Sequence, residues 1–319
     1  LYFAFSYISF MFIFTLPMAL GVTMMGNISV SKLISLWFRK YTGRALGIAS
    51  VGVSFAGFVF PNLTSFLLGD LGLTWREAYL LFGVLIILIN VPVVYLFIVN
   101  KPSDINQIPD GEGLTGYSED TLGVDWTIQG LLKDRNFWIL SLVFAIQFCS
   151  MMGILSHLTF FSEGAGWSQA WGAFIFSMYA WPAMFSKVFF GWLVENKIDA
   201  RLAVSIAVLI QAIATLLMIF VESPEQMVVL VMIFGFGGGS ALPLSNILFN
   251  QAYTNKSFGK ARGAAQPFIS IFQISGTLVA ARMFDVFGNY ELAFLTLGFI
   301  LIVPLIAIWF LKEEPKLAS

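Results

Sequence analysis

The segment ALGIASVGVSFAGFVFPNLTSFLLG, residues Ala45–Gly69, runs for 25 residues without a charged side chain. A helix needs about 20 apolar residues to cross a bilayer. Lipid tails offer no hydrogen-bond partners, and a helix satisfies its backbone N–H and C=O groups internally. We therefore expect an all-α, polytopic membrane protein, because the chain contains nine charge-free stretches of at least 19 residues. They are Leu1–Ser31, Ala45–Gly69, Ala78–Asn100, Asn136–Ser162, Gly164–Ser186, Leu202–Val221, Gln226–Asn255, Gly263–Ala281 and Leu292–Leu311.

The composition excludes several classes of function. Of the 319 residues, 58% are hydrophobic and 11% are charged, whereas a soluble domain carries about 25% charged residues. The net charge is -1 and no run of Lys or Arg exceeds two residues, which argues against a basic nucleic-acid-binding surface. Cys149 and His157 are the only residues of their types, so an intrachain disulfide or a multi-histidine metal site is excluded. We expect no enzymatic activity, no catalytic residues, no cofactor and no metal.

The distribution of Lys and Arg predicts the orientation in the membrane. Cytoplasmic connections between transmembrane helices are enriched in these residues. If the nine spans alternate in direction, the first, third, fifth and seventh connections and the C-terminus lie on the same side of the membrane. We predict that this side is cytoplasmic. The opposite side receives Arg76 alone, while Lys187 and Arg282 lie within or at the ends of spans. The cations on the predicted cytoplasmic side are Lys32, Arg39, Lys40, Arg44, Lys101, Lys133, Arg135, Lys197, Arg201, Lys256, Lys260, Arg262, Lys312 and Lys316.

An internal repeat indicates how the spans are grouped. FRKYTGRA (Phe38–Ala45) resembles FGKARGAA (Phe258–Ala265) at an offset of 220 residues, and Gly72–Tyr79 resembles Gly288–Phe294. Both pairs occupy equivalent places in the predicted topology, although chance similarity between glycine-rich basic loops is an alternative. The first three spans then repeat the last three of a six-span unit, and about three spans are expected to precede Leu1 in a longer protein.

The predicted domains follow from this grouping. Residues 1–100 form a partial N-terminal bundle of three helices, and residues 135–319 form a six-helix C-terminal bundle. The intervening residues 101–134 contain Pro, Gly, Asp, Asn and Glu without a long apolar run, as a cytoplasmic linker does. The end of this linker, VDWTIQGLLKDRNFW (Val124–Trp138), places apolar residues on one face, which predicts a short surface helix.

Four segments resemble one family of carriers. WFRKYTGRALGIASVGVSFAG (Trp37–Gly57) resembles the cytoplasmic entry to the fifth helix of monocarboxylate transporters and bacterial oxalate/formate antiporter-like carriers, which belong to the major facilitator superfamily. Arg135–Leu142, Ser156–Ser168 and Phe284–Phe294 resemble later parts of the same family. The resemblance implies helices four to twelve of a fold with two six-helix bundles, a central cavity and alternating access. It also implies a cytoplasmic gate motif that contains Arg39, Lys40, Gly43 and Arg44.

Lys187 is the main candidate for a substrate-binding residue. Lys187, Gly191 and Glu195 are spaced by four residues and share a helix face, and Lys187 lies about 12 Å deeper than Glu195 along the helix. A cation at such depth is costly and usually faces a cavity or a partner. The pattern resembles an Arg-x-x-x-Gly-x-x-x-Asp pattern of the family, which implies that Lys187 binds a substrate carboxylate. Here Lys replaces Arg and Ala183 replaces an acidic residue, and a snorkelling lysine is the alternative.

The segment GWLVENKIDAR (Gly191–Arg201) resembles the family's loop between helices eight and nine. The resemblance implies that Glu195, together with Gly191 and Arg201, belongs to a cytoplasmic gate that holds the two bundles together. On physical grounds, Glu195 can meet the positive end of the helix that starts near Gly43, as well as the Arg44 side chain.

Other polar residues within spans are candidates for the cavity, because polar side chains rarely face lipid. We predict that Gln147, Tyr179, Asn246 and Gln273 contribute to substrate binding, although contacts between helices are the alternative for each. Arg282 is placed near the outer end of its span, where it can attract anions or pair with Asp285. Further polar candidates are Asn27, His157, Ser186, Gln211 and Gln266.

The predicted function is secondary active transport of a small organic anion, similar to a monocarboxylate, by alternating access. The partners are this substrate, a coupling proton or counter-anion, and the lipid bilayer, with no nucleic acid. A carrier of a neutral or amphiphilic solute is the alternative, and a non-transporting receptor is a further one. We expect a monomeric, multi-pass protein of the plasma (cell inner) membrane with a cytoplasmic C-terminus.

Overall fold

The structure is a computed structural model that describes the chain except residues 1, 3–4, 39, 110–124, 197 and 313–319. The described residues are almost entirely helical, and they contain no β-sheet. Packing divides the chain into two units, and each is described by itself. The first unit comprises Leu1–Arg39 and Ala56–Tyr117, and the second comprises Lys40–Phe55 and Ser118–Ser319. The predicted all-α fold is therefore confirmed.

The first unit is built from apolar helices with largely exposed side chains. Thr74 caps its most apolar helix, because Thr74 Oγ1 accepts a hydrogen bond from the Glu77 main chain and the Glu77 side chain reaches back to Thr74. Such reciprocal capping fixes the start of a helix. The helices of this unit are α1 (Tyr7–Ile13), α2 (Ala19–Met24), α3 (Asn27–Trp37), the second half of α4 (Thr42–Ser65) and α5 (Trp75–Phe97).

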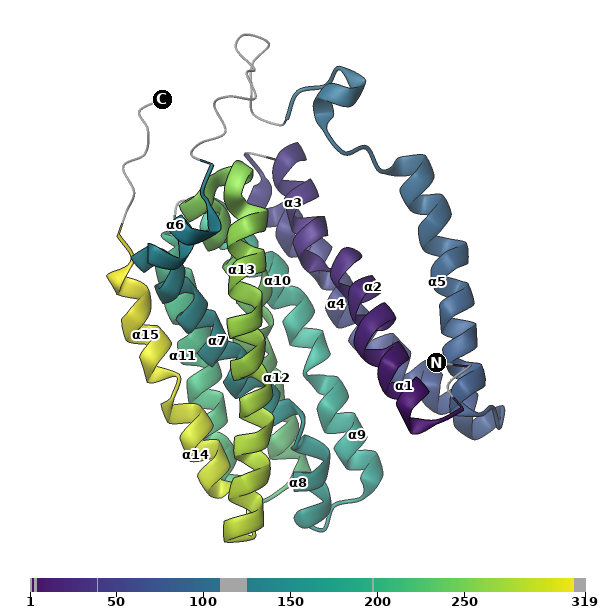
Figure 1. The fold of residues 1–319 in the computed structure, drawn as a ribbon. Helices are drawn as coiled ribbons and strands as arrows, with labels where there is room; N and C mark the ends of the chain where they lie inside the picture. The colour runs from purple at the N-terminus through teal and green to yellow at the C-terminus, as the bar shows by residue number, and fades with distance from the viewer. Residues whose placement is uncertain (1, 3–4, 39, 110–124, 197, 313–319) are drawn as a thin grey trace. The chain divides into compact units, whose positions relative to one another are not determined.

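The second unit contains the main core. Helix α7 packs along α13, and α10, α11 and α12 pack against one another (Figure 1). Its core is apolar, and Phe137, Phe144 and Phe234 have almost no exposed surface. Its helices are the first half of α4, α6 (Ile128–Lys133), α7 (Arg135–Leu155), α8 (Leu158–Gly164), α9 (Gln169–Met178), α10 (Ala180–Glu195), α11 (Ala200–Leu217), α12 (Pro224–Gly239), α13 (Ala241–Phe287), α14 (Glu291–Phe299) and α15 (Ile302–Ala307).

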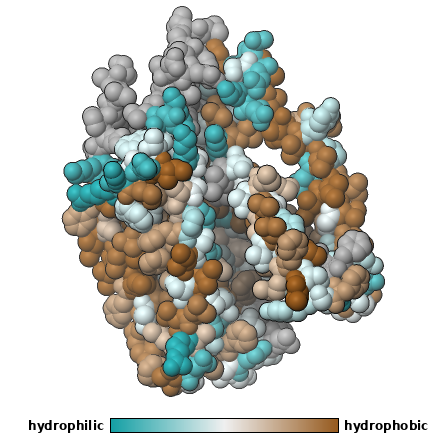
Figure 2. Space-filling model, viewed as in Figure 1, coloured by the Kyte–Doolittle hydropathy of each residue, from teal (hydrophilic) through white to brown (hydrophobic). Residues whose placement is uncertain are grey.

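Surface hydropathy agrees with a membrane environment for the second unit. Figure 2 shows that hydrophobic residues cover the middle of its visible face, while hydrophilic residues gather near its ends. In the described part of the chain, eight helices are long and apolar enough to cross a membrane. The multi-pass helical architecture predicted from the charge-free stretches is therefore confirmed.

The fifth predicted span, Gly164–Ser186, is not one continuous helix. It is divided between α9 and α10, with an interruption of the hydrogen-bond ladder at Tyr179. Pro182 explains the interruption, because it has no N–H to donate to the Met178 carbonyl and its ring clashes with that carbonyl. Neither helix alone is long enough to count as a span.

The predicted connection between the seventh and eighth spans, Lys256–Arg262, is also different, because these residues are helical and belong to α13. In a straight helix, Asn246 and Arg262 would lie about 24 Å apart. Instead, Nε of Arg262 donates to Oδ1 of Asn246 over 3.2 Å. The chain must therefore turn back between these residues, so two antiparallel legs exist as expected, joined by helical backbone and not by an open loop.

The short surface helix predicted near the end of the linker is present as α6. Its Leu131 is fully buried, and the preceding Trp126 packs edge to face against Tyr253 of α13. Asp125 forms an ion pair of 2.5 Å with Lys260, and this hydrogen bond lowers the pKa of the Asp125 carboxyl. Residues 110–124 of the predicted linker lie outside the described part of the chain.

Candidate functional site

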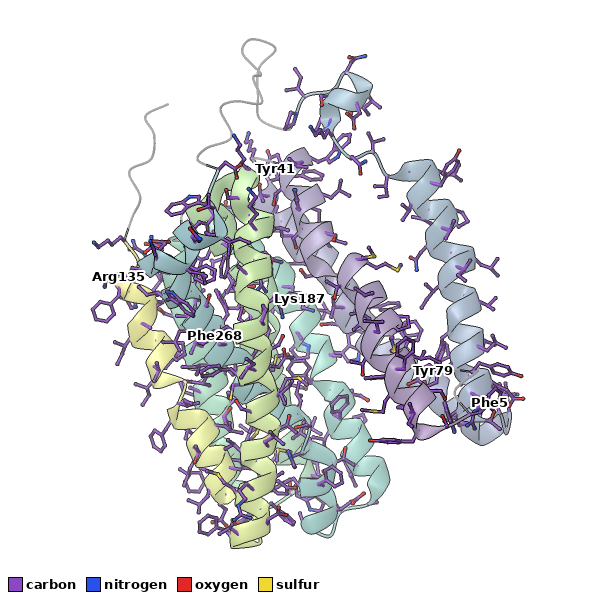
Figure 3. The ribbon with its side chains drawn as sticks, viewed as in Figure 1. Phe5, Tyr41, Tyr79, Arg135, Lys187 and Phe268 are labelled. Carbon is purple, nitrogen blue, oxygen red and sulfur yellow. The ribbon has the colours of Figure 1, made fainter. Side chains whose placement is uncertain are left out.

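Lys187 is buried in the second unit, with 4% of its surface exposed. Its Nζ donates to the main-chain oxygen of Ser50 over 2.9 Å and to Oγ of Ser54 over 2.6 Å. Both serines belong to α4, so the ammonium group is held between α10 and the first half of α4 (Figure 3). A lysine that snorkels to the membrane surface would be more exposed, so the snorkelling alternative does not describe Lys187.

In the described part of the chain, the buried ammonium group of Lys187 has only neutral hydrogen-bond partners. Among the residues that the structure describes, no carboxylate lies within 4.0 Å of its Nζ. Ala183, one turn earlier on α10, is fully buried and cannot supply one. An ammonium group has three donors, and these contacts use two of them. A buried cation without an anionic partner is costly, so this position is suited to an anion that arrives from outside the chain.

Glycines bring α4 and α10 together. A Cβ atom at Gly43 would lie 2.7 Å from the Gly191 carbonyl oxygen, and one at Gly47 would lie 2.6 Å from the Lys187 carbonyl oxygen. These distances leave no room for a side chain, so the two backbones touch, as small residues allow in membranes. The close approach places Ser50 and Ser54 within reach of Lys187.

The predicted contact between Glu195 and the start of α4 is present. Oε1 of Glu195 accepts a hydrogen bond of 2.5 Å from the main-chain N–H of Arg44. The second carboxylate oxygen lies 2.6 Å from Nε of Arg44, in an ion pair that lacks hydrogen-bond geometry. The carboxylate therefore compensates both the positive end of the α4 dipole and the guanidinium charge.

Two of the remaining predicted gate residues have other contacts in the described part of the chain. Arg201 pairs with Asp199 at 2.5 Å, and their hydrogen bond lowers the pKa of the Asp199 carboxyl. Lys40 lies 5.3 Å from the centre of the Tyr41 ring, as Arg44 does. Arg39 lies outside the described residues.

Two of the predicted cavity residues lie in the polar interior of the second unit. Gln147 is 1% exposed, and its side-chain amide has no partner among the described residues. Gln211 donates to the Gln147 main-chain oxygen over 3.3 Å. The Tyr179 hydroxyl and the Gln211 amide both lie next to Gly238. This interior thus contains buried polar groups that are available to a ligand or water.

Serines contribute to this interior more than the sequence indicated. Ser150 and Ser186 are fully buried, and neither hydroxyl has a partner among the described residues. Ser186 was a candidate, whereas Ser50, Ser54 and Ser150 were not. The spacing of Ser50 and Ser54 could have indicated them as partners of a buried group, because residues four apart share a helix face.

The other candidates lie elsewhere. The Asn246 side chain accepts a hydrogen bond from Arg262. Arg262 is 2% exposed and also donates hydrogen bonds to Ser245 and Gln266. Arg262 is therefore buried by packing against other residues of α13, whereas a residue of an open loop would be exposed. Gln273 is half-buried on α13 and makes no contact with Lys187.

Arg282 and His157, which were predicted to lie near the outer ends of their spans, are also separate from Lys187. Arg282 is exposed, and the expected ion pair with Asp285 is not formed within 4.0 Å. The His157 ring bonds to the Tyr290 hydroxyl at 3.0 Å and to the Thr277 carbonyl at 3.1 Å, which fits a structural role.

Comparisons with known proteins identify the family. The model of the Major Facilitator Superfamily matches residues 1–221 and residues 171–319. Monocarboxylate transporter 13 of Bos taurus is 26% identical over 272 residues, which is 83% of this chain and 59% of that protein. Monocarboxylate transporter 13 of Rattus norvegicus is 25% identical over 83% of this chain and 58% of its own length. An MFS-type transporter of Gibberella moniliformis is 20% identical, with coverages of 80% and 58%.

Solved structures share the fold. The E. coli fucose:proton symporter FucP superposes with a TM-score of 0.67 at 14% identity, covering 93% of this chain and 75% of that chain. The human organic anion transporter MFSD10 (TETRAN) superposes with a TM-score of 0.66 at 16% identity, covering 89% and 68%. The chain spans a little under three fifths of the curated relatives. It belongs to the major facilitator superfamily, whose members are membrane carriers and not enzymes.

Proposed function

We propose that the protein carries a small organic anion, of the monocarboxylate type, across the membrane by alternating access. The observation that supports this most directly is Lys187, a buried cation whose partners in the described chain are all neutral. A carboxylate that binds there would accept the remaining N–H and neutralise the charge. The named relatives include monocarboxylate transporters, and one of the similar folds is an organic anion transporter.

The geometry favours a compact anion. Lysine presents a point charge, whereas arginine presents a planar fork that pairs with both oxygens of a carboxylate. Ser54 Oγ, at 2.6 Å from Nζ of Lys187, also carries a hydroxyl proton that it can donate to the second carboxylate oxygen. Lys187 and Ser54 together would replace the two-point recognition that an arginine provides.

Coupling to a proton or a counter-anion is part of the proposal. With Ala183 one turn before Lys187, the nearest position on α10 offers no carboxyl group to carry a proton. Exchange of one anion for another needs no such group, because the ammonium group stays occupied in both directions. A proton that travels with a weak acid would serve equally well, and transport measurements at different pH gradients distinguish the two modes.

The gate proposed for alternating access is the contact between Gly43, Arg44, Gly191 and Glu195. The interruptions at Tyr179 and Ser240 provide places where α9–α10 and α12–α13 can bend. We propose that this contact opens and closes on the cytoplasmic side, in a carrier unit that acts as a monomer in the plasma membrane.

A neutral solute is the second candidate. Gln147 and Gln211 offer amide groups in a buried region without charge, and Tyr179 offers a hydroxyl group. Such groups are suited to bind sugar or alcohol hydroxyls, and one of the similar folds is a fucose:proton symporter. In that case Lys187 would act only in packing between α4 and α10.

Counterflow in proteoliposomes separates the candidates. The product of the complete gene is reconstituted, loaded with unlabelled lactate, formate, oxalate or fucose, and exposed to the labelled compound. We expect exchange of an anion by the wild-type protein and loss of exchange in Lys187→Ala. The matched control is Lys133→Ala, because Lys133 is an exposed lysine on α6. Exchange of fucose alone, or unchanged anion affinity and rate in Lys187→Ala, would reject the anion proposal.

A further inference from the structure

A groove on the outside of the second unit combines apolar walls with a charged end. It has a volume of about 460 Å³, which is within the range of about 300–1,000 Å³ for ligand sites. Its wall residues are strongly exposed for apolar side chains, with 67% for Phe185 and 62% for Ile48. The lining residues are Arg44, Ile48, Phe185, Val188, Phe189, Trp192 and Phe236.

The groove faces away from the candidate substrate site. Successive residues of a helix are rotated by about 100°, so the α10 residues of the groove point about 100–160° away from Lys187. Lys187 is buried, whereas Phe189 and Trp192 are 42% and 44% exposed. The groove face of α10 is thus apolar and exposed within the second unit, as a face in contact with lipid is.

The groove is charged at the end where α4 begins and α10 ends, and it is apolar farther along the helices. Arg44 lies in the first turn of α4, and Trp192 lies in the last turn of α10, so both mark the same end. Phe185 lies about 10 Å deeper than Trp192. Cations and tryptophans of membrane proteins prefer the headgroup level, so this order matches a phospholipid with its headgroup at Arg44 and an acyl chain toward Phe185.

The charges at the headgroup end favour an anionic lipid. Lys40 and Arg44 both lie 5.3 Å from the Tyr41 ring centre, and in the described chain Glu195 is the only carboxylate paired with Arg44. One net positive charge remains. The guanidinium of Arg44 meets Glu195 through Nε, its side chain is 42% exposed, and its terminal nitrogens donate to no described residue. These nitrogens suit a phosphate oxygen.

We propose that this groove is a binding site for an anionic phospholipid, whose phosphate contacts Arg44 and Lys40 and whose acyl chain lies along Ile48 and Phe185. Basic sites beside transmembrane helices bind anionic headgroups by this combination of charge and apolar surface. The site is separate from the one that contains Lys187, so it stands whatever the substrate is.

Native mass spectrometry of the complete gene product tests the site. The delipidated protein is titrated with dioleoylphosphatidylglycerol and, separately, with dioleoylphosphatidylcholine, and the lipid-bound fraction is measured. We expect tighter binding of phosphatidylglycerol and a loss of about tenfold or more in Arg44→Gln, which removes a charge-assisted phosphate contact. Lys133→Gln is the matched control for charge and should bind as the wild type does.

A second variant fills the groove and leaves the ion pair intact. Ile48→Trp should displace the acyl chain and reduce the affinity for phosphatidylglycerol, whereas Leu209→Trp, at an exposed aliphatic residue of α11, should not. If Arg44→Gln does not fold, the Ile48→Trp result decides the question. Equal affinity for the two lipids, unchanged binding in Ile48→Trp, or displacement of the lipid by soluble glycerol phosphate at the same concentration would overturn the proposal.

Discussion

Arg44 and Glu195 are 151 residues apart in sequence, yet the Arg44 main-chain N–H donates to the Glu195 carboxylate over 2.5 Å. The contact joins the first turn of α4 to the last turn of α10. A carboxylate at a helix N-terminus contributes about 0.3–1 kcal/mol when exposed and up to about 2 kcal/mol when partly buried, and the Glu195 side chain is 10% exposed. That energy is small enough for the contact to open and close in a transport cycle.

Glu195→Gln should weaken this contact. The amide oxygen can still accept the hydrogen bond from Arg44, but the negative charge is lost, so the contact loses its interaction with the helix dipole and the guanidinium. We expect a shift of up to about thirtyfold toward the state that is open at this end of α4 and α10. Labelling of cysteines introduced along the half of α4 that contains Arg44 measures this shift, and Glu163→Gln, at an exposed acidic residue, is the control. Unchanged labelling would contradict a gating role for Glu195.

Lys187→Met should separate a binding role from a structural one. Lys187 has no carboxylate partner among the described residues, so removal of its charge leaves no buried anion unpaired. We expect the thermal unfolding midpoint of the apo protein to stay equal or rise, while anion exchange is lost. A large drop in the midpoint would show instead that the ammonium group mainly holds α4 and α10 together.

Ser54→Ala should have an intermediate effect. It removes one of the two partners of Nζ and leaves the charge of Lys187 in place. Hydrogen bonds to charged groups contribute about 1.5–3 kcal/mol, so substrate affinity should fall by about tenfold or more. Titration of substrate-induced stabilisation measures the affinity. An affinity equal to that of the wild type would show that Ser54 does not shape the site.

Gly47→Ala should force α4 and α10 apart. The new Cβ would lie 2.6 Å from the Lys187 carbonyl oxygen, and overpacking of this kind costs about 1–3 kcal/mol. Gly52→Ala is a matched control on the same helix, because no atom lies within 4 Å of its Cβ. The unfolding midpoint should fall in Gly47→Ala and stay equal or rise in Gly52→Ala. Similar midpoints for both variants would argue against backbone contact.

The sequence predicts the architecture well because charge-free length is set by the thickness of the bilayer. The same rule cannot predict which face of a span is buried. Arg262 illustrates this limit, because its place beside a glycine between two spans does not reveal that the fold-back of α13 surrounds it with Ser245, Asn246 and Gln266. The site at Lys187 could be predicted only in part, because its serine partners lie more than 130 residues away in sequence.

Pro182 interrupts the hydrogen-bond ladder between α9 and α10 five residues before Lys187. In Pro182→Ala the new N–H can donate to the Met178 carbonyl, which should join the two helices and stabilise them by as much as about 3 kcal/mol. A stiffer helix bends less at Tyr179, so we expect a higher unfolding midpoint, slower hydrogen exchange near Tyr179 and slower transport.

Pro224→Ala is the matched control, since Pro224 lies in the first turn of α12, where proline breaks no helical hydrogen bond. It should change neither the transport rate nor hydrogen exchange near Tyr179. If Pro182→Ala slowed exchange while transport stayed at the wild-type rate, the bend at Tyr179 would have no part in the cycle. The hinge would then have to lie elsewhere, and the interruption at Ser240, after the glycines that end α12, is the next place to test.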